Sequence, residues 1–400
     1  MTKKNNKRRK EAKKKSAGRK LPDGIRISVP AVKIKVVGVG GAGGNIISRM
    51  SKDFGRGVEF IAINTDAQDL DCCLARKKIN IGRNLTKGMG TGMNPDLGRQ
   101  AAEENRSDIT EALDGADLVF LAAGMGGGTG TGAMPVVAEV AREIGALTVA
   151  VITKPFFFEG SQRNRIAEEG MLKLKDRVDS LIVVPNDRIF GVISSDTSLM
   201  KAFIKIDEIL KNTVKGISEI ISSAGLINVD FADVKTIMAN AGLALVGVGQ
   251  AAGKGRAGKA AAQAISSPLL EFSIDGAKGV LFGVSGGSDL KMAEVNEAAK
   301  VVTENVDPGA RIIFGAYFDR KLKPGQIKIS LIATGFNGLA RENPLNLLFS
   351  QRGGVFAERS AEKELNADKE TATKEEEAAK MAKKQEELLE IPAFLRKKKR

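Results

Sequence analysis

The feature that most constrains this chain is a dense run of glycines, GMGGGTGTG, at residues 124–132. The run follows an apolar segment, 117–123, that predicts a buried parallel strand, and it precedes a helical pattern at 133–144. Glycines at such a junction let successive backbone N–H groups face one anion, where the dipole of the following helix favours negative charge. A purely structural glycine turn is the alternative. The density of glycines favours a phosphate-binding loop, because glycine is costly unless something must approach the backbone.

A second glycine-rich loop, GVGGAGGN, occupies residues 38–45 within a predicted βαβ unit. Its spacing also fits the dinucleotide fingerprint G-x-G-x-x-G, so a nicotinamide-dependent dehydrogenase with Asp66 as the ribose-binding acid is an alternative. That alternative gives no reason for the loop at 124–132, whereas two glycine loops on one sheet favour a nucleoside polyphosphate. The elements predicted around the second loop are the strand 33–39, the helix 46–50 and the strand 58–64.

The composition excludes several classes of site. The chain has no histidine, and its two cysteines, Cys72 and Cys73, are adjacent. A histidine base, a Ser-His-Asp triad and a histidine-ligated metal are therefore excluded, and no disulfide framework is indicated. No apolar run is long enough for a membrane span, and the N-terminus lacks the apolar core of a signal peptide. We therefore expect a cytoplasmic protein with no metal site built from side chains.

The formal net charge of +14 is concentrated at the two ends of the chain. Residues 1–20 hold eleven Lys and Arg, and residues 391–400 hold five. The chain between these ends is close to neutral. Charge blocks of this kind are usually solvated and disordered, and a weak, salt-sensitive contact with anionic lipid or nucleic acid is the alternative.

A long helical pattern at 199–222 is apolar along one side and predicts a helix that connects two domains. The strand patterns that follow it, at 243–248, 279–284, 311–317 and 326–334, indicate a second α/β domain with a mostly β-rich sheet.

Two other segments are predicted to have no ligand. The segment 253–259, GKGRAGK, fits most of a P-loop pattern, but the next residue is Ala260, which has no hydroxyl group for magnesium. We predict a basic loop there. The three phenylalanines at 156–158 are expected in the core.

Several charged side chains are candidates for a nucleotide site, each with a structural alternative. Glu159 and Arg163 stand at i and i+4, as in an ordinary helix ion pair or a shared ribose contact. Asp207 is either a solvated acid on the long helix or a reader of the paired N–H donors of guanine. Asp230 and Asp233 either cap the helix that follows or orient an attacking water.

Together these motifs resemble those of the tubulin/FtsZ superfamily in order and spacing, from about Lys33 to Phe336. The loop at 124–132 is the signature of that superfamily. The terminal segment IPAFLR, at 391–396, resembles the tail by which FtsZ proteins bind adaptors. The other matching motifs are GVGGAGGN at 38–45, FIAINTD at 60–66, TKPFFFEG at 153–160, PNDR at 185–188 and NVDFADV at 228–234.

The resemblance implies a GTPase that polymerises head to tail into protofilaments of the bacterial division ring, at midcell beneath the inner membrane. It implies GTP and GDP as ligands, with Mg²⁺ held mainly by the phosphates. It also implies that the loop 228–234 of one subunit, the carboxylate loop, completes the active site of its neighbour. The implied catalytic residues are Asn228, Asp230 and Asp233. The implied nucleotide-binding residues are Gly41, Ala42, Gly43, Gly44, Asn45, Gly128, Thr129 and Gly130 for the phosphates, Glu159 and Arg163 for the ribose, and Asn186, Phe203 and Asp207 for guanine.

One assignment stays open within the resemblance. Arg165 is a second candidate for the ribose contact beside Arg163. The resemblance also implies partners of the division machinery at the membrane, which would bind the tail through Ile391, Phe394 and Leu395.

We therefore expect an α/β protein in which a Rossmann-like parallel-sheet domain is joined by a central helix to a second α/β domain, with disordered tails. The expected divisions are a basic tail (1–30), a GTP-binding domain (31–197), the central helix (198–223), a C-terminal GTPase-activating domain (224–336), a partly helical linker (337–390) and an adaptor-binding tail (391–400).

Overall fold

The computed structural model describes residues 32–336, except 53, 55–56, 192, 195, 223–224, 267–272 and 320–321. Every helix and strand below lies in the unit Met1–Gly335. The predictions for the two tails and the linker, at 1–30 and 337–400, lie outside the described residues. In the part of the chain that is described, no helix is long and apolar enough to cross a membrane.

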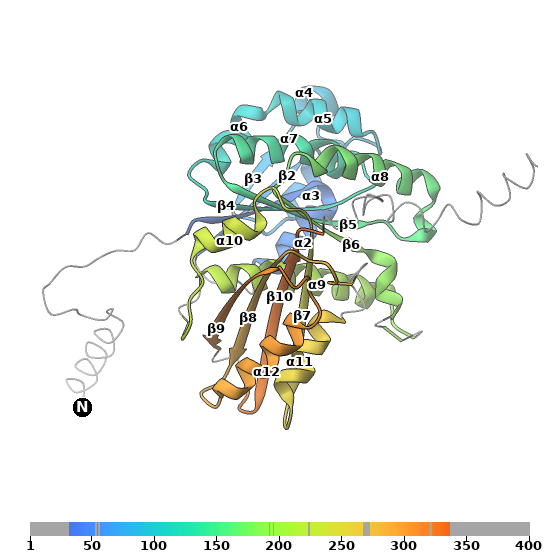
Figure 1. Cartoon of the computed structure of the whole chain (residues 1–400). Coiled ribbons are helices and arrows are strands. Elements are labelled where there is room, and N and C mark those ends of the chain that lie inside the picture. Colours follow the sequence, from blue (N-terminus) through green and yellow to red (C-terminus); the bar gives the residue numbers. More distant parts are fainter. Residues whose placement is uncertain are drawn as a thin grey trace, which may run out of the picture. The chain divides into compact units, whose positions relative to one another are not determined.

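The described strands form one ten-stranded sheet in the order β3-β2-β1-β4-β5-β6-β7-β10-β8-β9 (Figure 1). β1 to β6 pair in parallel, as expected for apolar runs that are buried on both faces. β7 pairs in parallel with the start of β6 and antiparallel with β10, which begins the second, mostly antiparallel part. The predicted α/β fold is confirmed. The strands are β1 Ile34–Val39, β2 Val58–Asn64, β3 Lys77–Asn80, β4 Leu118–Gly124, β5 Leu147–Lys154, β6 Ser180–Pro185, β7 Gly242–Ala252, β8 Gly279–Gly286, β9 Arg311–Phe318 and β10 Gln326–Thr334.

Helices cover both faces of the parallel strands. α5 to α8 gather on one face, and α2 lies on the other (Figure 1). α9 packs against α2, β7 and β10, so it joins the two parts of the sheet. The helices are α2 Gly40–Met50, α3 Ala67–Cys72, α4 Arg83–Thr86, α5 Pro95–Glu104, α6 Arg106–Leu113, α7 Thr129–Glu143, α8 Ser161–Lys175, α9 Leu199–Ser222, α10 Phe231–Met238, α11 Arg256–Ile265 and α12 Met292–Thr303, with the 3-10 turns η1 Phe157–Glu159 and η2 Asn186–Gly191.

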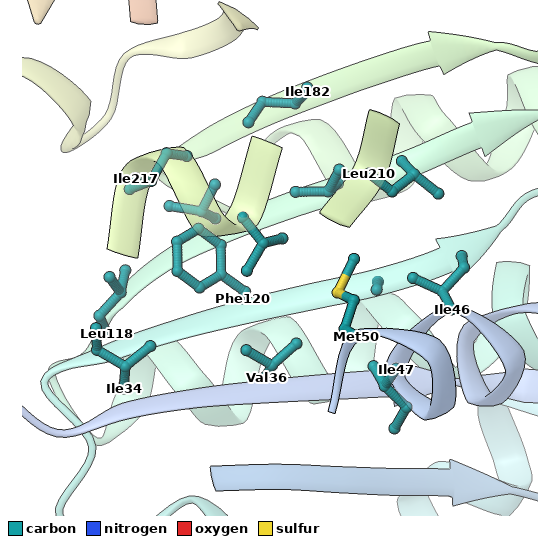
Figure 2. Packing of buried hydrophobic residues seen from close by; sticks show 14 of the residues in the cluster. Ile34, Val36, Ile46, Ile47, Met50, Leu118, Phe120, Ile182, Leu210 and Ile217 are labelled. Carbon is teal, nitrogen blue, oxygen red and sulfur yellow. The ribbon is translucent and has the colours of Figure 1, made fainter. Parts of the chain in front are cut away.

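A hydrophobic core fixes α9 and α2 on the same face of the sheet. Figure 2 shows Leu210 and Ile217 of α9 above Phe120 of β4, with Met50 of α2 beside them. All four side chains are buried. The position of α9 is therefore set by apolar burial against the strands that end in the two glycine loops.

The structure corrects two of the predicted helices. α2 and α7 begin at Gly40 and Thr129, so glycines expected in loops form the first turns of these helices. α5 and α6 follow each other directly and are divided at Asn105, which has φ −110° and ψ 27°. The side chain of Asn105 accepts a hydrogen bond from the Gly82 N–H (2.9 Å), which binds this break to the loop after β3.

The prediction of a basic loop at 253–259 is wrong beyond Gly255, because α11 begins at Arg256. The Arg256 side chain is buried, and its guanidinium donates to Asp289 Oδ2 (2.6 Å) and to Glu294 Oε1 (2.7 Å). Hydrogen bonds from Arg256 lower the pKa of both carboxyl groups, while those to Glu294 and Asp289 raise the pKa of Arg256 against the opposing effect of burial. The arginine of this motif therefore joins α11 to α12 and is not a phosphate ligand.

Candidate functional site

The two glycine loops meet where the strand order of the sheet reverses. β1 lies between β2 and β4, and the chain leaves β1 toward one edge of the sheet and β4 toward the other. In open parallel sheets, ligands bind outside the carboxyl ends of the strands at such a switch point. The loops at 38–45 and 124–132 follow these two carboxyl ends.

Two helix N-termini are brought together at this point. Gly40 has φ +73°, and a methyl group on it would lie 2.9 Å from the backbone nitrogen of Gly130. Neither α2 nor α7 has an acidic residue in its first turn, and neither N-terminus is capped by a described side chain. Unpaired N–H groups and two helix dipoles thus favour a multiply charged anion between the loops.

Packing explains most of these glycines, and Gly127 is an exception. A methyl group on Gly43 would lie 2.5 Å from the Ala122 carbonyl oxygen, and one on Gly128 would collide with the Thr91 hydroxyl. A methyl group on Gly127 would meet no described atom within 4 Å, and the φ of Gly127 lies outside the positive region that favours glycine. The fold therefore gives no reason for glycine at 127, whereas close approach of a ligand to the backbone does.

The threonines of the loop build its shape. Thr129 Oγ1 shares a hydrogen bond with Thr65 Oγ1 (2.7 Å) and another with Thr91 Oγ1 (3.2 Å). Thr131 Oγ1 accepts from the Gly126 N–H (2.9 Å). Both hydroxyls therefore tie the loop together, and the predicted phosphate contacts at Gly128, Thr129 and Gly130 depend on backbone groups.

The predicted phosphate residues Gly41, Ala42, Gly43, Gly44 and Asn45 all lie within α2, and α3, whose aspartates include Asp69, packs against that helix. Asp66 caps α3 by accepting from Gln68 N (2.9 Å) and Asp69 N (3.1 Å). This structural role weakens the dehydrogenase alternative, which needs Asp66 for a ribose. A methyl group on Gly41 would lie 2.6 Å from Asp69 Oδ2, so Asp69 places a carboxylate against the first turn of α2. The described residues contain no cluster of three or more potential metal-ligating side chains.

Glu159 and Arg163 are brought together at the start of α8, where they form an ion pair. Glu159 also accepts from the Phe156 N–H (2.9 Å), and the carbonyl oxygen of Arg163 would lie 2.8 Å from a methyl group on Gly126. The pair is therefore adjacent to the glycine loop after β4. Arg165 pairs with Glu169 at 3.6 Å and has a side chain that is 75% exposed. This geometry favours Arg163 over Arg165 at the nucleotide site.

The side chains predicted to bind a base lie on η2 and α9. Asn186 is buried, and its Oδ1 atom has no hydrogen-bond partner among the described residues. A buried amide oxygen without a partner is costly, and N–H donors of a ligand would satisfy it. Phe203 contacts Phe156 edge to face, with 5.7 Å between ring centroids, and remains half-exposed.

Asp207 has a partner that the sequence did not reveal. Its carboxylate forms an ion pair with Arg49, near the end of α2, and the Asp207 side chain is 14% exposed. The alternative of a freely solvated acid is therefore wrong for Asp207. Arg49 lies on α2, one turn beyond the predicted phosphate residues. The pairing could have been indicated only by apolar patterns showing that α2 and α9 pack against each other.

The three consecutive phenylalanines are not all in the core. Phe156 is buried, whereas Phe157 and Phe158 are 73% and 64% exposed, and the neighbouring Phe190 is also exposed. The prediction was wrong for these two rings because the 3-10 turn η1 lies at the surface after β5. The edge of the sheet that carries the glycine loops thus exposes an apolar aromatic group.

The carboxylate loop before α10 is anchored by its apolar residues and exposes its polar ones. Val229 and Val234 are buried, whereas Asn228, Asp230 and Asp233 are exposed. Asp230 occupies the N-cap position of α10, but its side chain makes no cap hydrogen bond within the described structure. The capping alternative therefore does not explain Asp230.

The carboxylate loop and the glycine loops lie at opposite ends of the parallel strands. α10 ends beside the start of β6, where Ser180 Oγ donates to the Met238 carbonyl oxygen (2.7 Å). Asn186 follows the other end of β6. A strand of this length spans about 20 Å. α9 gives the same separation, because Asp207 lies near its start and it ends at Ser222, six residues before Asn228. The two sets of predicted site residues therefore lie apart within one chain.

Two family models and several solved structures match the chain. The GTPase domain of the Tubulin/FtsZ family matches residues 33–194, and the C-terminal domain of the FtsZ family matches residues 242–337. The chain is similar to the solved structure of an empty FtsZ dimer from M. jannaschii, with 43% identity, a TM-score of 0.73, and coverage of 84% of this chain and 94% of that one. A second M. jannaschii FtsZ structure gives 44% identity, a TM-score of 0.72 and coverage of 83% and 95%. CetZ2 from Haloferax volcanii shares the fold, with 22% identity, a TM-score of 0.67 and coverage of 78% and 98%.

Proposed function

The chain belongs to the tubulin/FtsZ family of GTPases, and from this premise we propose that it forms head-to-tail filaments that hydrolyse GTP between subunits and build the ring of bacterial cell division. The separation of the glycine loops from the carboxylate loop is the observation that carries the proposal. It supports a site in which one subunit holds the nucleotide and the next supplies the groups that act on it.

The phosphates of GTP would lie between the N-termini of α2 and α7. Backbone N–H groups in the first turn of α2, at Gly41 and Ala42, would bind them on one side, with Gly43, Gly44 and Asn45 next along the helix, and those of Gly128 to Gly130 would bind them on the other. The open space at Gly127 supports this placement, because a phosphate oxygen can approach the backbone there.

The ribose and the base would extend from the phosphates toward η2 and α9. Glu159 would accept from a ribose hydroxyl, with Arg163 holding the carboxylate in place. The unpaired Asn186 Oδ1 would accept from a base N–H, Asp207 would accept from the paired donors of guanine, and Phe203 would stack on the ring.

A magnesium ion fits this chemistry as a companion of the phosphates. Mg²⁺ usually keeps several waters and is held by one or two carboxylates together with substrate phosphates. Asp69, which lies against Gly41, supplies a carboxylate at a suitable place. When bound, the ion would neutralise charge that develops on the phosphates.

Hydrolysis would require the carboxylate loop of a neighbouring subunit. Asp230 and Asp233 are exposed, with their loop held by Val229 and Val234, so they can reach into a partner without unfolding their own helix. Phosphoanhydride hydrolysis depends on positioning and charge stabilisation, so carboxylates and the Asn228 amide are adequate to orient water. Hydrolysis would then depend on assembly.

The exposed aromatic group supports a contact at the edge of the glycine loops. Phe157, Phe158 and Phe190 together form an exposed apolar surface beside the nucleotide site. Aromatic residues are enriched at protein interfaces. Because the glycine-loop edge would meet the opposite edge of the next subunit, the contact is heterologous and extends into a filament.

We also propose the domain divisions at 31–197, 198–223 and 224–336, a linker at 337–390 and an adaptor-binding tail at 391–400. Ile391, Phe394 and Leu395 would anchor the tail in an apolar groove of a membrane adaptor, and the ring would form at midcell. The basic ends would add at most a weak contact with anionic lipid or nucleic acid.

Replacement of Asp233 by Ala tests the proposal. GTP affinity should stay within about twofold, while hydrolysis per subunit should fall about 100-fold, as for loss of a group that positions the attacking water. Glu111→Ala, an exposed acid on α6, is the matched control and should change neither quantity. Equal loss of binding and hydrolysis in Asp233→Ala would make the loop a structural element and would contradict the proposal.

A further inference from the structure

The chain has one tyrosine and no tryptophan. This tyrosine, Tyr317 on β9, is buried, and its hydroxyl donates to the carbonyl oxygen of Ile220 in the last turn of α9 (2.9 Å). The last carbonyls of a helix have no partner within the helix. Tyr317 therefore binds the end of α9 to the sheet.

The ring of Tyr317 lies in a slot formed by three glycines. A methyl group on Gly225 would lie 2.9 Å from the ring and one on Gly283 would lie 3.2 Å from it, while one on Gly315 would collide with the hydroxyl. Any side chain at these positions would displace the ring or the backbone. The slot fixes the phenol in one place, and removal of the hydroxyl alone would leave the ring supported.

Strand β9 also holds the carboxylate loop. Ala316, next to Tyr317, exchanges backbone hydrogen bonds with Ile227 (3.0 and 3.2 Å), and Ile227 directly precedes Asn228. Burial raises the pKa of the Tyr317 hydroxyl to about 12, against the lowering effect of the nearby backbone of Val229, which stands between Asn228 and Asp230.

We propose that Tyr317 is the positioning residue that holds the carboxylate loop against the end of α9, so that its hydroxyl sets where Asn228 and Asp230 are presented to a neighbouring subunit. The inference rests on the proposed function. α9 has 24 residues and carries Phe203 and Asp207 near its other end. At 1.5 Å per residue it spans about 36 Å, so a shift of this helix at the nucleotide would be transmitted to the loop through one hydrogen bond.

Tyr317→Phe tests this role, because it removes the hydroxyl and keeps the ring. The expected result is a fall in kcat per assembled subunit of about tenfold, the range of one positioning hydrogen bond. GTP affinity, KM and the protein concentration at which assembly begins should stay within twofold. A general loss of stability would change all of these quantities together.

Thr334→Val is the matched control. Thr334 is also buried, and its hydroxyl donates to the Ile237 carbonyl oxygen (3.0 Å) at the far end of α10. This variant loses a comparable buried hydrogen bond away from Asn228 and Asp230, so its kcat should stay close to that of the wild type. Equal losses of kcat in the two variants would overturn the specific role of Tyr317.

The intrinsic fluorescence of the protein supplies a second readout, since Tyr317 is its only tyrosine and tryptophan is absent. Tyrosine emission should change when GTP drives assembly, at the same protein concentration as light scattering. Emission that is unchanged on assembly, or an unchanged kcat in Tyr317→Phe, would overturn the inference. If the wild type itself neither binds nor hydrolyses GTP, the proposed function fails instead.

Discussion

Gly127 allows the phosphate-binding role of the glycine loop to be separated from its structural role. A side chain at this position would meet no described atom within 4 Å, and the backbone there does not need a positive φ. Gly127→Asp should therefore leave the fold intact and place a carboxylate beside the bound phosphates.

The loss of affinity follows from the charge. A carboxylate about 5 Å from one phosphate charge, at an effective dielectric constant of about 20, adds about 3 kcal/mol of repulsion. This corresponds to a Kd for GTP that is weaker by a factor of about 100 to 200. Gly127→Asn has nearly the same volume without the charge, and it should lose less than about tenfold. Gly127→Ala should lose still less, because a single methyl group only narrows the approach of the phosphate to the backbone.

Calorimetric titration of GTP into each variant, together with thermal unfolding, tests this reasoning. The unfolding temperatures of all three variants should lie close to that of the wild type. The reasoning is refuted if Gly127→Asp binds GTP normally. It is also refuted if Gly127→Ala lowers the unfolding temperature as strongly as Gly128→Ala, whose methyl group would collide with the Thr91 hydroxyl.

Three further predictions concern stability, magnesium and the tail. Arg256→Met should lower the free energy of unfolding near neutral pH by about 2 kcal/mol, measured by urea denaturation, because it leaves two carboxylates without their partner. Arg256 lowers the pKa of Asp289 and of Glu294 below their ordinary values of 3.8 and 4.5. The stability that the two ion pairs provide is therefore present above these ordinary pKa values and is lost as the pH falls through the lowered ones. Below pH 4.5, the free energy of unfolding of the variant should consequently depend less on pH than that of the wild type. Asp69→Asn should tighten GTP binding in EDTA and weaken it in Mg²⁺, and an unchanged ratio of the two affinities would remove Asp69 from the ion. Deletion of 391–400 should leave GTP-driven assembly in solution unchanged by light scattering, and loss of assembly would place the tail inside the filament contact.

Much of the fold could be predicted because the relevant signals are local. Uninterrupted apolar runs indicated the parallel strands, and the 3.6-residue pattern of 199–222 indicated α9 at the bounds that the structure has, Leu199–Ser222. The start of α7 was misplaced by four residues, because glycine is a poor helix former and its helical φ and ψ at Thr129–Gly132 are imposed by contacts with α5 and the loop before it.

Site residues could be predicted only where they belong to a recognisable sequence motif. The ion pair of Asp207 with Arg49 and the bond of Tyr317 with Ile220 each join elements that are distant in sequence. No spacing rule connects such residues, because the packing of α9 across the sheet determines which side chains meet. The exposure of Phe157 and Phe158 was missed for a related reason: hydrophobicity indicates burial in general, but a surface that binds another subunit is also apolar.

The separation of Asn186 from the carboxylate loop is the result that local patterns could not supply. Both segments resemble parts of one active site, and their sequences alone do not tell whether they meet within one chain. Asn186 follows one end of β6 and α10 ends beside the other, and this separation is why we propose that hydrolysis requires two subunits.

The most direct test of that requirement is the rate of GTP hydrolysis per subunit, with Mg²⁺ present, measured over a range of protein concentrations together with light scattering. Hydrolysis between subunits predicts a rate per subunit that is close to zero at low concentration and rises above a threshold at which scattering also begins. A rate per subunit that does not depend on concentration would mean that each chain carries a complete active site, and it would contradict hydrolysis between subunits.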